Sequence, residues 1–247
     1  MSWQRRGAER SVQEKAGPWD LVSRADLETE EVIRGVLSQH RPDDCVRGEE
    51  LGTDQGTTGV SWLVDPIDGT TSYLYGRADW AVSVAAFGPD GRVAAGVVVE
   101  PAYGRTSSAT RGCGTLVDDR PASLSSTTTL DQALVEINFG RRDQHPRAGA
   151  MVDVLLGEVR DLRRGGSAAS SLAHAASGRA DAVWSPGLQP WDGAAGVLLV
   201  LEAGGIVGDL DGPSGGRWPE SGDVLAAPEA LWEPLRDLLA GVYHRDS

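Results

Sequence analysis

The chain has 247 residues, of which 40% are hydrophobic and 24% charged, as in ordinary globular proteins. Its formal net charge of −13 argues against a nucleic-acid surface, since phosphate backbones require basic patches, and no apolar run approaches the ~20 residues of a membrane span. No secretory signal is visible, and the two cysteines, Cys45 and Cys113, do not make a disulfide framework, so we expect a cytoplasmic protein.

The N-terminal part of the chain predicts one helix. Residues 1–14 are polar with weak helical potential, and residues 15–20 predict a loop that carries Lys15, the only lysine. Apolar residues then recur at helical spacing, and Asp26 is predicted to be the N-cap of this helix. The helix breaks at residues 41–44, residues 45–50 predict a short strand that ends in G-E-E, and residues 52–59 predict a flexible loop.

Residues 62–71, W-L-V-D-P-I-D-G-T-T, carry two carboxylates at the end of an apolar run. The run predicts a buried strand, and a strand that stops at Asp65 places this carboxylate at the rim of a sheet, where ligands bind. Pro66 is expected to end the strand and to hold the turn rigid, so that Asp68 reaches the same small volume. On its own, a D-x-x-D pair is also typical of an Asp-Pro turn followed by a capping aspartate.

The residues that follow the two aspartates favour phosphate chemistry. Gly69 has no side chain, so a ligand can approach the backbone closely. Thr70 and Thr71 can open a helix whose free N–H groups bind phosphate. Two carboxylates, a backbone carbonyl and a phosphate would together supply the oxygen ligands that hard cations such as Mg²⁺ prefer.

The remaining sequence predicts a mixed sheet followed by alternating strands and helices. Residues 79–87 and 92–100 predict a hairpin around the turn G-P-D-G, and residues 106–110 predict a third strand. A Ser/Thr-rich stretch indicates a boundary between an α+β half, residues 1–120, and an α/β half, residues 121–247. In the second half we expect strands at residues 133–139, 180–184, 206–210 and 224–227, and helices at residues 150–162, 167–176, 190–203 and 229–242.

Four motifs occur in order along the chain: D-L-V-S-x-x-D at residues 20–26, G-E-E at 48–50, D-P-I-D-G-T at 65–70 and W-D-x-A-A-G at 191–196, the last continuing to E-A-G-G at 202–205. Each motif alone has an ordinary structural explanation, since Asp26 and Asp192 can cap helices and a Glu-Glu pair is usually solvated surface. In this order and spacing they resemble the inositol monophosphatase-like family, the Mg²⁺-dependent, lithium-sensitive phosphatases.

The resemblance implies an α/β (α+β) fold, a layered α-β-α-β-α sandwich of the inositol monophosphatase/fructose-bisphosphatase type, and a homodimer. It implies two or three Mg²⁺ ions, which Mn²⁺ can replace, in a site where a metal-activated water attacks phosphorus. The ligands implied are Glu49, Asp65, Asp68, Asp192 and the carbonyl oxygen of Ile67.

The same resemblance implies the roles of the remaining site residues. Asp26 and the Thr70 hydroxyl would orient the water and take its proton, with the ligand Glu49 counted among the catalytic groups. Lys15 falls where the family has a lysine on a mobile loop over the site, and the alternative is a plain surface lysine. The residues expected to bind substrate are Gly69, Thr70, Thr71, Gly166, Ser167, Ala168 and Ser185.

Two departures from the family limit the substrate assignment. The chain before Lys15 is short, which bears on the lid and on the dimer contact. Ser185 stands seven residues before Asp192, where inositol-handling members carry a glutamate that binds substrate hydroxyls. The four histidines sit in unrelated segments without metal-ligand spacing.

We therefore predict a Mg²⁺-dependent phosphomonoesterase for a small polyol, cyclitol or sugar phosphate, similar to inositol 1-phosphate, with no nucleic-acid or membrane partner. A histidinol-phosphate or 3′-phosphonucleotide phosphatase stays open, although Thr71 stands where nucleotide-acting relatives typically have lysine. A non-catalytic relative that serves as a binding partner also stays open.

Overall fold

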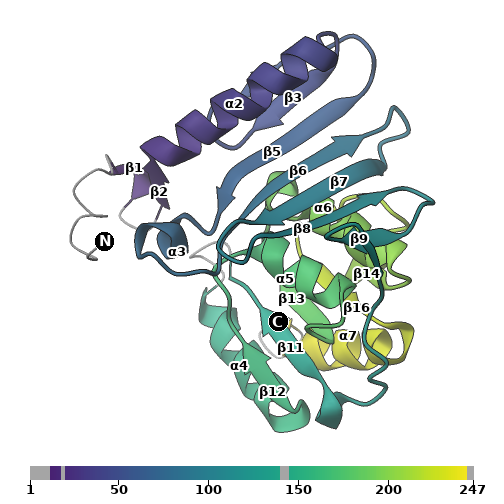
Figure 1. Ribbon diagram of the computed structural model, residues 1–247. Helices are drawn as coiled ribbons and strands as arrows, with labels where there is room; N and C mark the ends of the chain where they lie inside the picture. The colour runs from purple at the N-terminus through teal and green to yellow at the C-terminus, as the bar shows by residue number, and fades with distance from the viewer. Residues whose placement is uncertain (1–11, 18–19, 140–144, 244–247) are drawn as a thin grey trace.

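The structure is a computed structural model that describes residues 12–17, 20–139 and 145–243 (Figure 1). No helix within these ranges has the length and apolar character needed to cross a bilayer.

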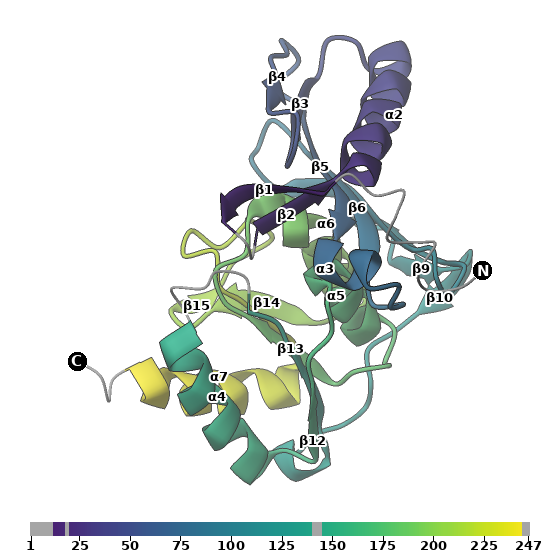
Figure 2. The ribbon, with the colours of Figure 1, turned by 90° about the vertical axis from the view of Figure 1, so that its left-hand side faces the viewer.

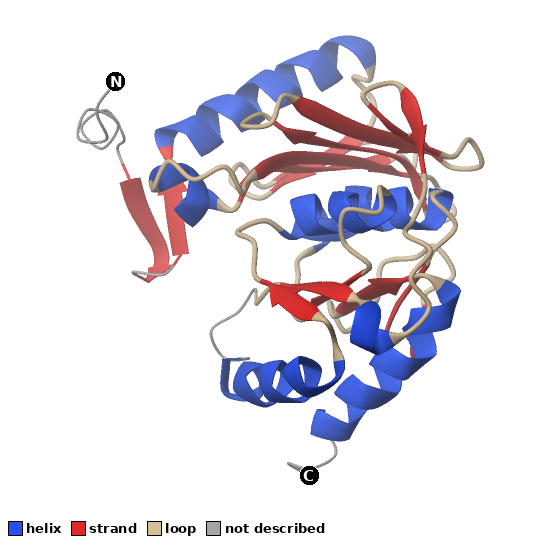
Figure 3. Cartoon of the chain, turned by 60° about the horizontal axis from the view of Figure 1, so that its bottom comes forward, coloured by secondary structure: helices blue, strands red, loops and turns tan. Residues whose placement is uncertain are grey.

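Helices and sheets alternate in layers. Helix α2 (Arg24–His40) covers the outer face of a first sheet, and α5 (Ala168–Ala176) and α6 (Pro190–Glu202) lie between this sheet and a second one. Helices α4 (His145–Glu158) and α7 (Glu229–Tyr243) cover the far face of the second sheet, as Figure 3 shows. The predicted α-β-α-β-α sandwich is confirmed.

The first sheet contains the predicted hairpin. Its order is β10-β9-β8-β7-β6-β5-β3-β4, and all neighbours are antiparallel except β3 and β5. Its strands are β3 (Cys45–Gly48), β4 (Thr53–Asp54), β5 (Ser61–Asp68), β6 (Ala81–Phe87), β7 (Val93–Glu100), β8 (Arg105–Thr110), β9 (Thr115–Val117) and β10 (Arg120–Ala122). Strand β5 therefore lies inside the sheet, which explains its apolar sequence.

The second sheet is mixed, in the order β12-β11-β13-β16-β14-β15. Strand β11 is parallel to both of its neighbours, and the other pairs are antiparallel. Its strands are β11 (Leu134–Ile137), β12 (Asp161–Arg163), β13 (Ala182–Ser185), β14 (Ile206–Asp209), β15 (Gly212–Pro213) and β16 (Val224–Ala227). The division of the chain after residue 120 stays a prediction, since the helices between the sheets pack against both.

Strand β5 corrects the prediction that Pro66 ends the strand. The strand continues to Asp68, and its pairing with β6 shifts register between Asp65 and Asp68, which face Ser83 and Ala81. Three steps on β5 thus match two on β6, so one extra residue is accommodated in a bulge, where proline's missing N–H does no harm. On a regular strand, residues three apart point to opposite faces, and the bulge lets both carboxylates reach one pocket.

The N-terminal region also differs from the prediction. Strands β1 (Val12–Gly17) and β2 (Asp20–Ser23) pair antiparallel, so Lys15 lies in a strand and not in a loop. Helix α2 begins at Arg24 with Ser23 as its N-cap, and Asp26 occupies the third helical position of a capping box. Figure 2 shows the hairpin beside the start of α2, and β2 contacts α3 (Thr70–Leu74). These contacts bring the start of α2 to the end of β5.

Helix α4 ends earlier than predicted, at Glu158, because the chain then turns into β12. The expected helix over residues 150–162 therefore includes three strand residues, Asp161–Arg163, that pair with β11. Leu162 satisfies a helical apolar pattern and a short strand equally well, so periodicity alone could not separate the two.

Small residues let α6 pack closely between its neighbours. A Cβ atom on Gly96 of β7 would lie 2.9 Å from the Cα of Ala195, and one on Gly196 would lie 2.4 Å from the Cβ of Leu172 in α5. The run A-A-G of the fourth motif therefore has a packing role. At the far end of α6, Glu202 accepts hydrogen bonds from the backbone N–H groups of Gly112 (2.8 Å) and Gly114 (2.9 Å), which ties the helix to the end of β8.

A charged cluster around His174 of α5 links the two sheets. His174 Nδ1 lies 2.8 Å from Oε1 of Glu136 in β11, and Nε2 lies 2.9 Å from Oε1 of Glu100 in β7. Arg179 and Arg105 also contact Glu100, at 3.3 and 3.4 Å. Burial lowers the pKa of His174, but the hydrogen bonds to Glu100 and Glu136 outweigh it and raise the pKa to about 9. The protonated ring donates both hydrogen bonds.

We expect the change His174→Gln to destabilise the protein by about 2 kcal/mol at pH 6, because a partly buried charged link between the sheets is lost. A raised folded-state pKa contributes stability in full below the unfolded value of 6.5 and loses it as pH rises through about 9. The difference in unfolding free energy between wild type and variant should therefore shrink between pH 6 and pH 10. Urea unfolding of both proteins at the two pH values measures it, and an equal difference at both would contradict a charged His174.

Candidate active site

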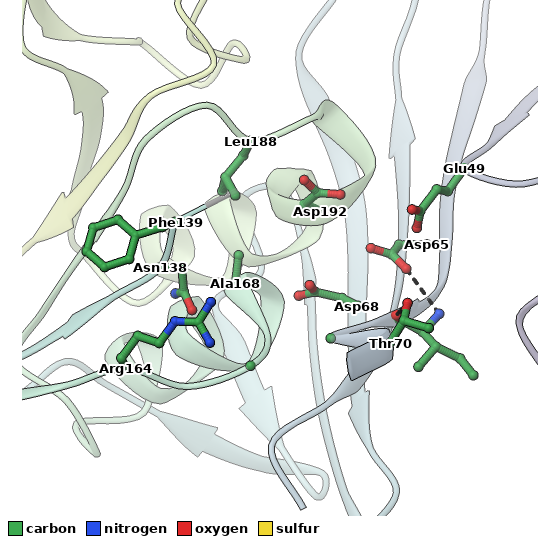
Figure 4. Close-up of a pocket in the computed structure, with 13 residues that line it drawn as sticks. Glu49, Asp65, Asp68, Thr70, Asn138, Phe139, Arg164, Ala168, Leu188 and Asp192 are labelled. Atoms are coloured by element: carbon green, nitrogen blue, oxygen red, sulfur yellow. Dashed lines mark hydrogen bonds between the residues drawn. The ribbon is translucent and has the colours of Figure 1, made fainter. Parts of the chain in front are cut away.

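A pocket of about 120 Å³ opens at the end of β5, facing the first turns of α5 and α6 (Figure 4). Its wall combines acidic, small and apolar residues from both halves of the chain. The lining residues are Glu49, Asp65, Ile67, Asp68, Gly69, Thr70, Asn138, Phe139, Arg164, Gly166, Ala168, Leu188 and Asp192. The two ends of the wall differ, with most of the acids at one end and Asn138, Phe139, Arg164 and Leu188 at the other.

Glu49 reaches the pocket because the loop after β3 is fixed from behind by α2. The Glu30 side chain is fully buried and accepts hydrogen bonds from the N–H groups of Glu50 (2.8 Å) and Leu51 (3.1 Å). Arg34 neutralises Glu30 at 2.8 Å. A Cβ atom on Gly48 would overlap the Glu30 carboxylate, so a larger residue at this position would displace the group that fixes the loop.

The two β5 aspartates are held differently. Asp65 is buried and accepts one hydrogen bond from the N–H of Ile67 (3.0 Å). Asp68 reaches across to the start of α5, where Oδ2 accepts hydrogen bonds from Ser167 Oγ (2.7 Å) and Ala169 N (2.6 Å). Asp68 thereby joins the first sheet to the second half of the chain and keeps its other oxygen for the pocket.

Asp192 enters the pocket from the first turn of α6. Gln189 is the N-cap of this helix, and Asp192 at the third position accepts a hydrogen bond from the N–H of Gln189 (2.8 Å). Ser83 of β6 donates to the carbonyl oxygen of Trp191 (3.1 Å), which fixes this turn against the first sheet.

The acids in the pocket are poised to bind positive charge. Burial first, and then the charges of the neighbouring acids, raise the pKa of Asp65 and of Asp192 well above the usual value. Burial raises the pKa of Asp68 to about 7, against the hydrogen bonds from Ser167 and Ala169 that lower it. A cation in the pocket would relieve this repulsion.

The donor set fits a hard divalent cation. The carboxylates and the carbonyl oxygen of Ile67 are all oxygen donors, which is the chemistry that Mg²⁺ requires. Within the described ranges no three histidine, cysteine or acidic side chains already form a closed cage, so these groups line the pocket around an open volume.

A hydroxyl–carboxylate pair lies at the edge of the acid cluster. Thr70 Oγ1 is 3.3 Å from Asp26 Oδ1 and 3.2 Å from the carbonyl oxygen of Ile67. Asp26 is fully buried, and its Oδ2 accepts hydrogen bonds from the N–H (2.8 Å) and the hydroxyl (2.5 Å) of Ser23. Gly69, with φ of 95°, turns the chain so that Thr70 faces this carboxylate.

Comparisons with known proteins agree with this geometry. Residues 2–244 match the inositol monophosphatase family. The chain belongs to this family. It is 37% identical to the inositol-1-monophosphatase of Rhizobium meliloti, over 90% of this chain and 84% of the relative. It is also 38% identical to the Nus factor SuhB of Xylella fastidiosa, over 89% of this chain and 82% of the relative.

Solved structures of relatives show the same fold. The extragenic suppressor protein suhB from Bartonella henselae superposes with a TM-score of 0.89 at 34% identity, covering 96% of this chain and 92% of that one. The IMPase from Thermotoga maritima gives a TM-score of 0.87 at 27% identity, covering 99% and 93%. Family membership makes the chain an enzyme of the phosphoric monoester hydrolase class.

The structure brings most of the residues expected from the family's motifs to one pocket. The five expected metal donors line it together with Gly69, Thr70, Gly166 and Ala168. Asp26 contacts Thr70, and Ser167 donates a hydrogen bond to Asp68, so both support lining residues without lining the pocket themselves. Thr71 is exposed and does not line the pocket. Lys15 lies in β1, and its side chain is outside the described residues.

Ser185 takes a different place from the expected one. It is fully buried in β13, does not line the pocket, and lies 3.2 Å from Nδ2 of Asn138, which does. Sequence reasoning missed Asn138, Phe139, Arg164 and Leu188, which form the end of the pocket away from most of the acids. None belongs to one of the four motifs, and the only available signal was their position after strands or beside the G-G-S-A-A stretch.

Proposed function

We propose that this chain is a Mg²⁺-dependent phosphomonoesterase that hydrolyses a small polyol, cyclitol or sugar phosphate. The observation that carries the proposal is the convergence of Glu49, Asp65, Asp68 and Asp192 on one pocket that also contains the Thr70 hydroxyl. Four carboxylates repel a phosphate ester unless cations lie between them, so the site as a whole matches a metal–phosphate complex.

The four carboxylates and the carbonyl oxygen of Ile67 would hold the metal, in two or three Mg²⁺ positions that Mn²⁺ can also fill. When bound, the metal supplies positive charge for the transferring phosphoryl group and lowers the pKa of a water molecule. Lithium sensitivity, a homodimer and a cytoplasmic location remain parts of the proposal.

The chain's own residues orient the reaction. The Thr70 hydroxyl donates toward Asp26 Oδ1, so Thr70 Oγ1 can accept a hydrogen bond from the attacking water. The proton of this water then passes to Thr70 Oγ1 while the Thr70 proton moves to Asp26 Oδ1. Ser23 holds the other Asp26 oxygen, which fixes the carboxylate during this transfer. A Cβ atom on Gly69 would lie 2.8 Å from the carbonyl oxygen of Gly166, so glycine at this position lets the turn pack against the segment before α5.

We expect phosphate release only in the presence of a divalent cation. Millimolar Mg²⁺ or Mn²⁺ should support turnover, and excess EDTA should abolish it, because the carboxylates then repel the ester. The measurement is inorganic phosphate released from inositol 1-phosphate, glycerol 2-phosphate, a hexose phosphate, histidinol phosphate and a 3′-phosphonucleotide. Full activity in metal-free buffer would contradict the proposal, and a preference for either of the last two esters would select the alternative phosphatases.

A second candidate is a non-catalytic binding protein. It is favoured by one observation, that relatives 38% and 36% identical to this chain are named Nus factors. The complete acid set argues for catalysis, since a binding role alone does not require four mutually repelling carboxylates. A folded protein that binds Mg²⁺ calorimetrically but releases no phosphate from any ester would favour this candidate.

A further inference from the structure

Among the described residues that line the pocket, Arg164 is the one with a basic side chain. It follows β12 and precedes the start of α5, and its guanidinium group lies beside Asn138, across the pocket from the acid cluster (Figure 4). Arg164 is exposed, and no residue in the described ranges hydrogen-bonds to its side chain or pairs with it. Its neighbour Arg163, in contrast, pairs with Asp161 at 2.5 Å and lies outside the pocket lining.

Asn138 presents a fixed acceptor at the same end of the pocket. It is 6% exposed, and Nδ2 lies 3.0 Å from Ser171 Oγ and 3.2 Å from Ser185 Oγ. The Ser171 hydroxyl donates its proton to the carbonyl oxygen of Ser167 (3.0 Å), so Ser171 must accept from the amide. This requirement orients the amide and leaves Oδ1 without a partner in the described ranges, at the pocket wall.

The two groups together match a ligand with a hydroxyl and an anion. A guanidinium group binds a carboxylate or phosphate through two parallel hydrogen bonds, and an amide oxygen accepts from a hydroxyl. The acids at the opposite end bind the metal and, through it, the phosphate to be hydrolysed. Arg164 can therefore bind a different part of the same substrate molecule.

We propose that the site selects phosphate monoesters that carry a carboxylate as a second anionic group. Arg164 holds the second anion, and Asn138 Oδ1 accepts a hydrogen bond from a neighbouring hydroxyl. Ser185 and Ser171 act as positioning residues for Asn138. This inference rests on the proposed phosphatase function and specifies its substrate class.

The test compares glycerol 2-phosphate with 2-phosphoglycerate, because a carboxylate replaces a hydroxymethyl group in the second ester. We expect kcat/KM in Mg²⁺ to be higher for 2-phosphoglycerate in the wild type. The change Arg164→Gln should lower kcat/KM for 2-phosphoglycerate by about 10- to 100-fold, the range expected when a charge-assisted contact is lost, and should alter glycerol 2-phosphate less than threefold. Arg164→Lys should recover part of the loss, and Arg163→Gln, a matched loss of charge beside the pocket, should change neither ester.

Two results would overturn the inference. Equal losses for both esters in Arg164→Gln would show that Arg164 only attracts phosphate in general, and no loss would make it a surface arginine. Wild type that hydrolyses neither these esters nor any other would refute the proposed function instead. In that event calorimetric binding of the same two esters in Mg²⁺ to wild type and Arg164→Gln decides the role of Arg164, because an inactive protein does not consume its ligand.

Discussion

Replacing Asp65 by asparagine is expected to lower Mg²⁺-supported turnover by roughly 10³-fold. Asp65 is buried at the centre of the acid cluster, and asparagine has nearly the same shape but no negative charge. The variant therefore keeps the bulge in β5 while it loses the charge that holds the cation. Initial rates of phosphate release over a range of Mg²⁺ concentrations measure the loss. Turnover within threefold of wild type at saturating Mg²⁺ would show that Asp65 has a structural role only.

The same substitution should leave the metal-free protein at least as stable as wild type, because repulsion among buried acids decreases. Asp44 provides the matched control, since its side chain is also shielded from solvent but has compensating partners. It accepts hydrogen bonds from Arg41 (2.7 Å), Thr58 (2.5 Å) and Trp62 (2.9 Å). The hydrogen bond from Arg41 outweighs burial and lowers the pKa of Asp44 to about 2.

The change Asp44→Asn should therefore destabilise the protein by about 1–3 kcal/mol at pH 7, because one amide cannot satisfy all three donors. The contribution of Asp44 is present above its unfolded pKa of 3.8 and is lost as pH falls through about 2. Urea unfolding in EDTA separates the two acids. A destabilised Asp65→Asn variant together with a neutral Asp44→Asn variant would reverse the assignment of functional and structural carboxylates.

The sequence was informative where one local pattern determines one structure. The apolar run before Asp65, the turn at Gly69 and the small residues of α6 each have a single physical reason, and these segments occupy the predicted places. The end of β5 was not predictable in this way. Proline usually stops a strand, and only the pairing with β6 reveals that a bulge accommodates it.

The roles of side chains at the site were also only partly predictable from the sequence. Ser23 and Asp26 both suit the start of a helix, and the capping box uses both, with the serine as the cap. Asn138 and Arg164 lie 26 residues apart and meet only because β11 and β12 are adjacent parallel strands. The sequence contains no local pattern that predicts this proximity. The end of the pocket that we assign to substrate selection is therefore evident only from the folded structure.

The pair formed by Thr70 and Asp26 should act as one unit in proton transfer. We expect Asp26→Asn to lower kcat by roughly 10²–10³-fold, because an amide cannot take the proton that Thr70 passes on. Thr70→Val removes the hydroxyl without a large change of shape and should cause a similar loss, whereas Thr70→Ser should stay within about tenfold of wild type. If the two residues act together, the double variant Asp26→Asn/Thr70→Val should be no slower than either single variant.

Ser23→Ala separates the catalytic role of Asp26 from its role in the capping box. This change removes one hydrogen bond to Asp26 Oδ2 but leaves Oδ1 and Thr70 in place, so it should cost about 1 kcal/mol of stability with only a small effect on kcat. Asparagine at position 26 can still accept a hydrogen bond from the N–H of Ser23, so the start of α2 should persist in Asp26→Asn. Circular dichroism and thermal unfolding check this point. Multiplicative losses in the double variant would show that Asp26 and Thr70 act independently. Equal losses of kcat in Ser23→Ala and Asp26→Asn would mean that Asp26 supports the helix and takes no part in proton transfer.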